Sequence, residues 1–291
     1  MFKGVGTALI TPFTSDGSLD EAAFQKFVDW QIEEGINFLV PCGTTGENPT
    51  LTADEHRRVV ELTVKTANGR VPVLAGAGSN STARAVELAQ QAVDLGADGI
   101  LSITPYYNKP TPDGLVRHFG AQGEAVEKMR AGFPMVVYNV PGRTGLNMSS
   151  DTTLRIAREV PNVVGVKEAS ANMEQILAIL RERADGFLVL GGDDAWTLPL
   201  LGAGADGVIS VASNEVPRLM RQLVDERSVA IHNRLLPLLV GNFIESNPAP
   251  AKAAMKMMGI LESDTLRPPL APMTAANRER LRGILEECGL L

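Results

Sequence analysis

Short apolar runs alternate with longer amphipathic stretches along most of the chain. A short apolar run bounded by turn residues is typical of a buried strand, and apolar residues spaced three or four apart are typical of a helix. The apolar runs predict strands at Gly4–Ile10, Phe38–Cys42, Val71–Ala75, Gly99–Thr104, Met135–Val140, Val163–Lys167, Phe187–Leu190 and Gly207–Val211. The amphipathic stretches predict helices that include Glu21–Glu34, Ala53–Ala67, Thr82–Leu95, Asn172–Arg183 and Ala195–Leu201.

Eight units of a strand followed by a helix indicate a parallel sheet, and eight is the number of strands that closes a (β/α)8 barrel. An open doubly wound sheet usually has fewer strands and is the weaker alternative. We therefore expect an α/β protein with a (β/α)8 TIM barrel as its catalytic domain over residues 1–225. Further helical patterns at Ala230–Ile244, Pro250–Met258 and Thr274–Glu287 exceed what an eighth barrel helix needs. They predict an appended C-terminal helical bundle over residues 226–291.

Three segments, Glu34–Phe38, Leu95–Ile100 and Gly204–Val208, place a glycine just before a predicted strand. Glycine accepts the left-handed conformation that ends a helix. The recurrence favours a barrel built from repeated units, although αβ loops also resemble one another without such a repeat.

Composition narrows the class of protein. The formal net charge of -7 argues against a broad nucleic-acid or acidic-membrane surface. Cys42 and Cys288 are the two cysteines, too few for a disulfide framework, and they fit a reducing compartment. No signal-peptide pattern opens the sequence, and no apolar run is long enough to span a membrane. We expect a cytoplasmic location.

The first candidate for chemistry is Lys167, which ends the almost wholly apolar strand Val163–Lys167. Lysine is rarely buried without a partner, and the end of a barrel strand opens into the active-site mouth. Partial desolvation there lowers the lysine pKa and frees a neutral amine to attack a carbonyl. A lysine that reaches the surface, or pairs with Glu168, is the alternative.

The turn Gly43–Glu47 follows the second predicted strand. Its glycines allow close approach of a ligand to the backbone, and its N–H groups together with the hydroxyls of Thr44 and Thr45 suit a small carboxylate. A purely structural turn is the alternative reading.

Tyr138 and Arg143 follow the fifth predicted strand, next to the strand that carries Lys167. A phenol has an ordinary pKa of about 10, so Tyr138 needs a chain of hydroxyls to move a proton at neutral pH. The forked guanidinium group of Arg143 suits the binding of a second carboxylate. The alternatives are a tyrosine that caps the core and an arginine on a surface loop. Tyr106 and Tyr107 follow the fourth strand, so all three tyrosines lie at strand ends on one face.

Gly191–Asp194 ends the seventh predicted strand. Paired aspartates suit a metal, but a helix N-terminus capped by carboxylates is the favoured interpretation. The three histidines and two cysteines show no spacing typical of metal ligands, and we expect no metal and no organic cofactor. Cys42 has no candidate base nearby in the sequence and is interpreted as a small buried residue.

In combination, Gly43–Glu47, Tyr138–Pro141 and Gly165–Glu168 resemble the class I pyruvate aldolases, the family that includes dihydrodipicolinate synthase and N-acetylneuraminate lyase. The resemblance covers essentially the whole chain. Within the family, Pro141–Gly145 and Pro105–Pro110 resemble the dihydrodipicolinate synthase branch. That branch condenses pyruvate with L-aspartate 4-semialdehyde to give 4-hydroxy-tetrahydrodipicolinate, the first committed step of lysine biosynthesis through diaminopimelate.

The resemblance implies a catalytic role for five residues. Lys167 forms the imine with pyruvate, and Tyr138 is the general acid and base. Thr45 and Tyr107 complete a proton relay with Tyr138, and Thr44 helps to position it. The equivalent of Tyr107 is donated across a tight dimer interface, which implies a homo-oligomer, with a tetramer of tight dimers expected.

The resemblance also implies the substrate contacts. Thr44 and Thr45 hold the pyruvate carboxylate, Arg143 binds the carboxylate of aspartate semialdehyde, and Gly192 and Ile209 line the pyruvate pocket. The closest alternative is another pyruvate-dependent aldolase, acting on N-acetylneuraminate or a 2-keto-3-deoxy sugar acid. Such enzymes lack this arginine in the matching loop. A non-catalytic binding protein is a further alternative, but it would need no nucleophile and relay together.

A regulatory site is also implied. In lysine-sensitive members of the family, the effector binds at the tight dimer interface, and His56, Asn80 and Tyr106 match the residue types there. Arg84 stands where those enzymes commonly carry a glutamate, and Ala53 where some carry a larger residue. We therefore expect inhibition by L-lysine to be weak or absent.

Overall fold

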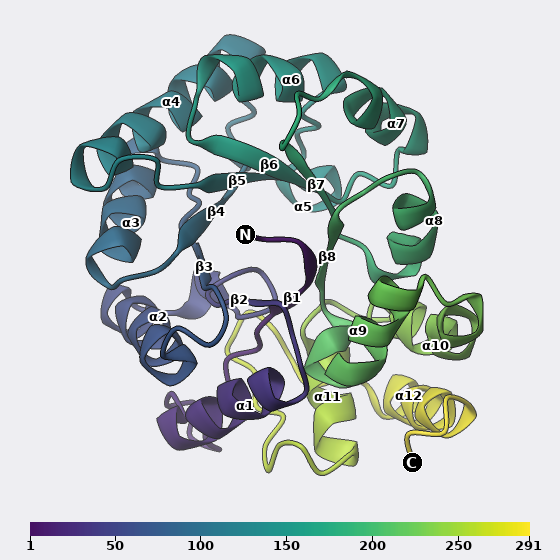
Figure 1. Cartoon of the computed structure of the whole chain (residues 1–291). Helices are drawn as coiled ribbons and strands as arrows, with labels where there is room; N and C mark the ends of the chain where they lie inside the picture. The colour runs from purple at the N-terminus through teal and green to yellow at the C-terminus, as the bar shows by residue number, and fades with distance from the viewer.

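The computed structural model covers residues 1–291 and shows eight parallel strands in a nearly closed barrel, ringed by helices (Figure 1). The strands are β1 Gly4–Ala8, β2 Phe38–Val40, β3 Leu74–Gly76, β4 Gly99–Ile103, β5 Met135–Asn139, β6 Val163–Glu168, β7 Leu188–Gly191 and β8 Gly207–Ser210. They are ordered β2-β1-β8-β7-β6-β5-β4-β3, and an isolated bridge between Leu39 and Val73 joins the two ends of the sheet. The predicted TIM barrel is confirmed.

Twelve α-helices cover the outside of the barrel or follow it. They are α1 Glu21–Glu33, α2 Ala53–Ala67, α3 Thr82–Asp94, α4 Pro112–Met129, α5 Pro141–Thr144, α6 Ser150–Glu159, α7 Met173–Glu182, α8 Thr197–Gly202, α9 Pro217–Glu226, α10 Val229–Gly241, α11 Ala249–Met257 and α12 Ala275–Glu287. Helix α2 matches its predicted range because Thr52 and Glu55 form a capping box at its start. Gly35, Gly96 and Gly204 adopt positive φ angles after their helices, as predicted.

Three predicted elements differ from the structure by more than a residue or two at an end or by being divided. The helix predicted at Ala230–Ile244 ends earlier, at Gly241, as α10. The strand predicted at Val71–Ala75 begins only at Leu74, because Pro72 has no N–H to donate and contributes just its carbonyl oxygen, which accepts from Leu39. The helix predicted at Ala195–Leu201 is divided into a short 3-10 helix, Asp194–Trp196, and α8.

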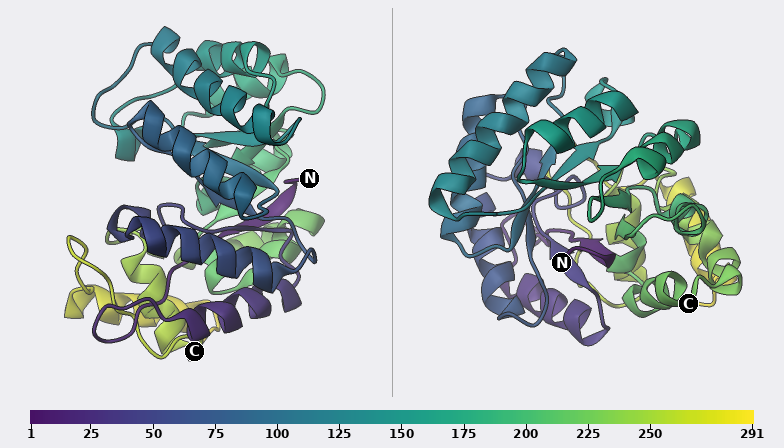
Figure 2. Two further views of the ribbon diagram at one scale, coloured as in Figure 1. Left: turned by 90° about the vertical axis from the view of Figure 1, so that its left-hand side faces the viewer. Right: turned by 45° about the horizontal axis from the view of Figure 1, so that its top comes forward.

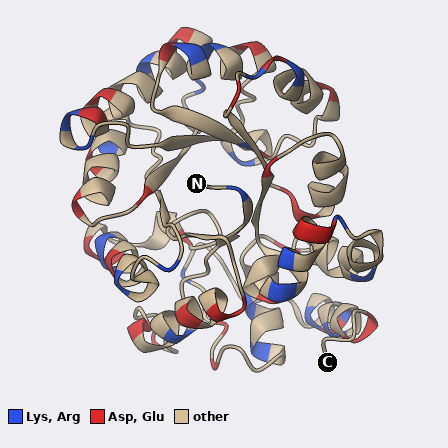
Figure 3. Ribbon diagram, in the orientation of Figure 1, with Lys and Arg blue, Asp and Glu red and all other residues tan.

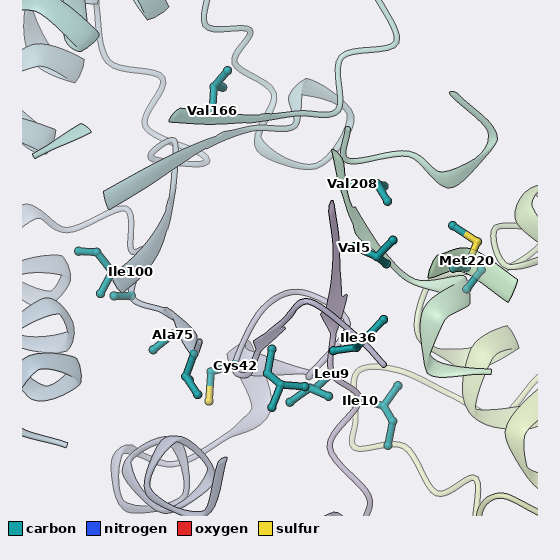
Figure 4. Close-up of a cluster of buried hydrophobic side chains, with 14 of the residues drawn as sticks. Val5, Leu9, Ile10, Ile36, Cys42, Ala75, Ile100, Val166, Val208 and Met220 are labelled. Atoms are coloured by element: carbon teal, nitrogen blue, oxygen red, sulfur yellow. The ribbon is translucent and has the colours of Figure 1, made fainter. Parts of the chain in front are cut away.

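The barrel strands separate two apolar cores. One core fills the space between the strands and the helices, and Figure 4 shows members such as Val5, Ile100 and Val166 pointing away from the barrel axis. The other, smaller core fills the barrel interior and includes Tyr138 and Ile209. Because side chains alternate along a strand, the outward Val166 requires that Lys167 face the interior.

Helices α10, α11 and α12 gather on one side of the barrel, next to α9 and near α1 (Figure 2). The predicted division between residues 225 and 226 lies one residue before the end of α9, so its place as a domain boundary stays a prediction. Charged residues of both signs lie mainly on the outer helices, while the barrel strands are almost free of them (Figure 3). No helix is both long and apolar enough to span a membrane.

Candidate active site

Lys167 and Tyr138 lie side by side at the carboxyl ends of neighbouring strands. The two residues are paired in the register of β5 with β6. The Nζ atom of Lys167 lies 4.3 Å from the centre of the Tyr138 ring. Both side chains are buried, at 6% and 7% exposure. The pairing follows directly from parallel strands in register, and it places an amine beside a phenol at the mouth of the barrel.

The environment of Lys167 favours its neutral form. Burial lowers the pKa of Lys167 to about 8, the carboxylate of Asp194 opposes that shift, and the positive charge of Arg143 adds to it. The unprotonated fraction of this amine near neutral pH is therefore far larger than that of an ordinary lysine. This is the condition under which a lysine attacks a carbonyl carbon.

The environment of Tyr138 favours the protonated phenol. Burial raises the pKa of Tyr138 to about 12, while Arg143 and a side-chain hydrogen bond with Thr44 act in the opposite direction. The phenol therefore holds its proton at neutral pH and can pass it on only through a hydrogen-bonded partner. Thr44 lines the same cavity as Tyr138 and is the hydroxyl that acts on its pKa.

Behind the pair, a polar network fixes the ends of β5 and β6. The buried carboxylate of Glu168 accepts hydrogen bonds from Asn139 Nδ2 at 3.1 and 3.2 Å, from Gln175 Nε2 at 3.1 Å and from the Ser170 N–H at 2.8 Å. Three donor groups on one carboxylate hold the backbone next to Lys167 in a single arrangement.

The turn Gly43–Glu47 closes the opposite side of the site. Thr44 is half-buried and lines a cavity of about 260 Å³ together with Tyr138, Arg143 and Tyr106. Thr45 is buried next to Thr44, and its Oγ1 accepts a hydrogen bond from Asn247 Nδ2 at 3.0 Å. The structure thus places Thr44, and not Thr45, beside the phenol.

Arg143 lies in the short helix α5 with its side chain exposed at the rim of this cavity. Its charge acts on the pKa of both Lys167 and Tyr138, so its guanidinium group is close to the reacting groups. A larger cavity of about 530 Å³ lies between α1 and residues 259–263, but none of the predicted site residues lines it.

The two neighbouring tyrosines differ in position. Tyr106 is 39% exposed and lines the cavity, whereas Tyr107 is 89% exposed and points away from the single chain. Tyr107 also has a φ angle of 72°, which an L-residue adopts only when its surroundings require it. Tyr107 is not among the residues that line the cavity containing Tyr138.

Gly192 lies beside Lys167. A Cβ atom on Gly192 would lie 2.6 Å from the Ala169 Cβ atom and 3.1 Å from the Lys167 Cε atom, so a larger residue here would crowd both side chains. Ile209 belongs to the interior core of the barrel. Asp193 caps the following helix by accepting from the Ala195 N–H, as predicted, but Asp194 instead accepts from the N–H groups of Val211 and Ala212.

Known proteins of one family are similar to this chain over essentially its whole length. A model of the dihydrodipicolinate synthetase family matches residues 1–288. The 4-hydroxy-tetrahydrodipicolinate synthase of Oleidesulfovibrio alaskensis is 51% identical over 297 residues, covering 100% of this chain and 99% of the relative. The chain belongs to the dihydrodipicolinate synthetase family.

Solved structures of the same family have the same fold. The dihydrodipicolinate synthase of Acinetobacter baumannii, in complex with pyruvate, is 40% identical, has a TM-score of 0.95 and is covered over the full length of both chains. A monomeric dihydrodipicolinate synthase variant is 44% identical with a TM-score of 0.94, over 100% of this chain and 98% of that one.

The predicted effector residues lie on α2, on α3 and in the loops after β3 and β4. His56 on α2 is buried, and its Nε2 lies 2.9 Å from the carbonyl oxygen of Gly76. The charge of Arg84 on α3 contributes to lowering the His56 pKa, after the larger effect of burial, which places the two residues near each other. Asn80 is tied through its carbonyl oxygen to Asn108 Nδ2 at 2.9 Å, close to Tyr106 in the chain.

Some residues of the site were not predicted from the sequence. For Asn139 a signal exists, because it is a polar residue that ends a buried strand directly after Tyr138. Gln175 lies on α7, shortly after Glu168 in the chain, whereas Asn247 comes from a loop remote from the motifs, and only the fold brings it to Thr45. No three His, Cys, Asp or Glu side chains lie together as a metal site would require.

Proposed function

We propose that this chain condenses pyruvate with L-aspartate 4-semialdehyde through a Schiff base on Lys167, giving 4-hydroxy-tetrahydrodipicolinate. The observation that carries the assignment is the buried Lys167 with its lowered pKa, paired with Tyr138 across β5 and β6. Membership in the dihydrodipicolinate synthetase family favours this reaction over cleavage of N-acetylneuraminate or a 2-keto-3-deoxy sugar acid. Arg143 at the rim offers the second carboxylate site that this reaction needs.

The chemistry begins at the amine. Neutral Lys167 attacks the pyruvate ketone, and loss of water leaves an imine, with protons moved through Tyr138 and the hydroxyl of Thr44. The imine withdraws electrons, so the pyruvate methyl group loses a proton and becomes the enamine carbon nucleophile. That carbon attacks the aldehyde carbon of the second substrate. The amine of the second substrate then attacks the imine carbon, displaces Lys167 and closes the ring.

Each hydroxyl on the turn has a separate task in this scheme. Thr44 is the relay hydroxyl, because it lines the same cavity as Tyr138 and acts to lower the Tyr138 pKa. Thr45 binds the pyruvate carboxylate. The place in the relay that the family resemblance implied for Thr45 is taken by Thr44. Gly192 leaves room for the imine, and Ile209 forms the apolar floor.

Tyr107 completes the relay from a second copy of the chain. Its 89% exposure and positive φ angle support this proposal, since an exposed tyrosine in an unfavourable backbone conformation needs a reason. We propose a tight dimer in which each Tyr107 enters the partner's site, and a tetramer built from two such dimers. Two free, buried cysteines support a reducing compartment, the cytoplasm.

The decisive experiment is reduction with borohydride in the presence of pyruvate. The unaltered chain should gain one covalent adduct on Lys167 by mass spectrometry, and Lys167→Ala should gain none. The rate of imine formation should rise with pH and level off above about pH 8, because only the neutral amine reacts. Lys65→Ala, an exposed lysine on α2, is the control and should keep the full adduct. A full adduct on another lysine in Lys167→Ala would refute the assignment.

Subunit exchange tests the role of Tyr107. Tyr107→Phe and Tyr138→Phe should each lose about one to three orders of magnitude in turnover, the range for assisted proton transfer. Mixed dimers of the two variants contain one site with both tyrosines intact, so mixing should restore part of the activity. If exchange is shown by mass and no activity returns, Tyr107 acts within its own chain or not at all.

A further inference from the structure

The C-terminal helical extension, residues 226–291, contacts the turn Gly43–Glu47 at two points. Asn247, in the loop between α10 and α11, donates from Nδ2 to the Thr45 Oγ1 atom at 3.0 Å. Lys252 on α11 pairs with Glu47 at 2.5 Å, and the backbone N–H of Arg267 donates to the same carboxylate at 3.1 Å. The segments in contact lie about two hundred residues apart in the sequence.

The second of these contacts makes the turn rigid. The side chains of Glu47 and Lys252 have no exposure to solvent, and Lys252 also donates to the carbonyl oxygen of Thr265 at 2.9 Å. Glu47 has a φ angle of 54°, in the left-handed region. Such a conformation persists only when its surroundings fix it, and a buried ion pair does so.

The first contact determines what the Thr45 hydroxyl can do. A hydroxyl has one proton to donate and two lone pairs that accept, whereas an amide nitrogen only donates. Because Asn247 Nδ2 donates to Thr45, the contact occupies a lone pair and leaves the Thr45 proton available. Thr45 is 3% exposed and donates to no other group of the chain. A buried donor without a partner is costly unless a ligand satisfies it.

We propose that Asn247 is a positioning residue for pyruvate: it orients the Thr45 hydroxyl so that its proton points to the substrate carboxylate. The inference rests on the proposed function, in which Thr45 binds that carboxylate. It makes the C-terminal extension part of the substrate site through one side-chain contact. Asn247 touches no reacting atom, so its effect should appear in pyruvate binding and not in the chemical step.

The test compares Asn247→Ala with the unaltered full-length chain. The pyruvate KM should rise about tenfold, the lower end of what one hydrogen bond to a charged group contributes, while kcat changes less than about threefold. Asn242→Ala is the matched control, because Asn242 is equally buried in the same extension but donates to Glu215 at 2.8 Å. That control should lower the melting temperature and leave the pyruvate KM unchanged.

Asn247→Asp tests the direction of the hydrogen bond. A carboxylate only accepts, so it would take the Thr45 proton away from the substrate, and the pyruvate KM should rise at least as far as in Asn247→Ala. An unchanged KM in Asn247→Asp would mean that the amide oxygen faces Thr45, and it overturns the inference. An unchanged KM in Asn247→Ala, with a fall in melting temperature like that of the control, also overturns it.

The two proposals can fail separately. Covalent trapping of pyruvate on the unaltered chain tests the function of Lys167, and the KM ratio between Asn247→Ala and Asn242→Ala tests the inference. An adduct without a KM effect leaves the function in place and removes the role of Asn247.

Discussion

The two sides of the candidate site are built in opposite ways. The side formed by β5 and β6 carries Lys167 and Tyr138, and its support comes from nearby in the chain: Asn139 and Gln175 bind the carboxylate of Glu168, the residue next to Lys167. The side formed by the turn Gly43–Glu47 carries the hydroxyls, and its support comes from the C-terminal extension.

This difference separates two tasks. A nucleophile and its acid need fixed mutual geometry, and paired parallel strands provide it through their register. A carboxylate-binding turn needs donors without partners of their own, which strands cannot offer because their N–H groups are bonded to the neighbouring strand. A turn can offer them, but it must be held from outside. We therefore expect changes in the extension to affect binding and stability, and changes around β6 to affect chemistry.

The largest expected effect is on stability, and it comes from the ion pair by which the C-terminal extension holds the turn. Lys252→Met leaves the Glu47 carboxylate buried without its ammonium partner and should lower the free energy of unfolding by about 3–5 kcal/mol. Lys65→Met is the control, because the pair of Lys65 with Glu61 is exposed and contributes at most about 1 kcal/mol. Urea unfolding at one protein concentration measures both.

A double variant tests the cause of that loss. Lys252→Met combined with Glu47→Leu removes both charges and should recover much of the stability, because two apolar side chains in place of a buried pair are often neutral or stabilising. If Lys252→Met costs no more than the control, the turn does not depend on this pair.

The next largest effect is on catalysis, and it comes from the residues packed around Lys167. Gly192→Ala places a Cβ atom 2.6 Å from Ala169 Cβ and 3.1 Å from Lys167 Cε, so the lysine must move. A displacement of this kind should lower kcat/KM for pyruvate by about 10- to 100-fold. Gly202→Ala on α8 meets no atom within 4 Å and should have the activity of the parent. Equal activity of the two variants would show that Lys167 has room to spare.

The same comparison explains which parts of the site could be predicted. The strands follow from apolar runs, and their parallel order brings Tyr138 next to Lys167, so this side was predictable from local pattern. The other side was not. Cys42 and Glu47 both have left-handed backbone conformations, which break the alternation of side chains along the turn. No rule of sequence then decides which of Thr44 and Thr45 faces Tyr138.

Long-range contacts set the other limit of prediction. Asn247 stands in Ser246-Asn247-Pro248, which reads as an ordinary turn, and only the packing of the extension against the barrel brings it to Thr45. The exposure of Tyr107 was likewise not derivable from one chain's pattern, because a residue at a strand end normally faces the site.

The smallest expected effect is the inhibition by L-lysine. It tests whether the side of the site formed by the turn Gly43–Glu47 can bind an effector. His56 and Arg84 lie on this side, since the Cys42 thiol of the same loop donates to the carbonyl oxygen of His56 at 3.7 Å. Arg84 pairs with Glu87 at 2.9 Å and is 43% exposed. A bound lysine would bring an ammonium group toward this guanidinium. We expect initial rates to be almost unchanged at several millimolar L-lysine.

The size of the effect follows from the repulsion between Arg84 and the ammonium group of L-lysine. Two like charges about 4 Å apart repel by about 4 kcal/mol at an effective dielectric near 20. Solvent screening of an exposed group leaves about 1 kcal/mol, which weakens binding about fivefold. Arg84→Glu reverses the sign, so it should create or strengthen inhibition, while Arg84→Gln should fall between the two. Half-maximal inhibition of the unaltered chain below about 1 mM, or no response to Arg84→Glu, would mean that Arg84 does not govern this site and that another residue binds the ammonium group.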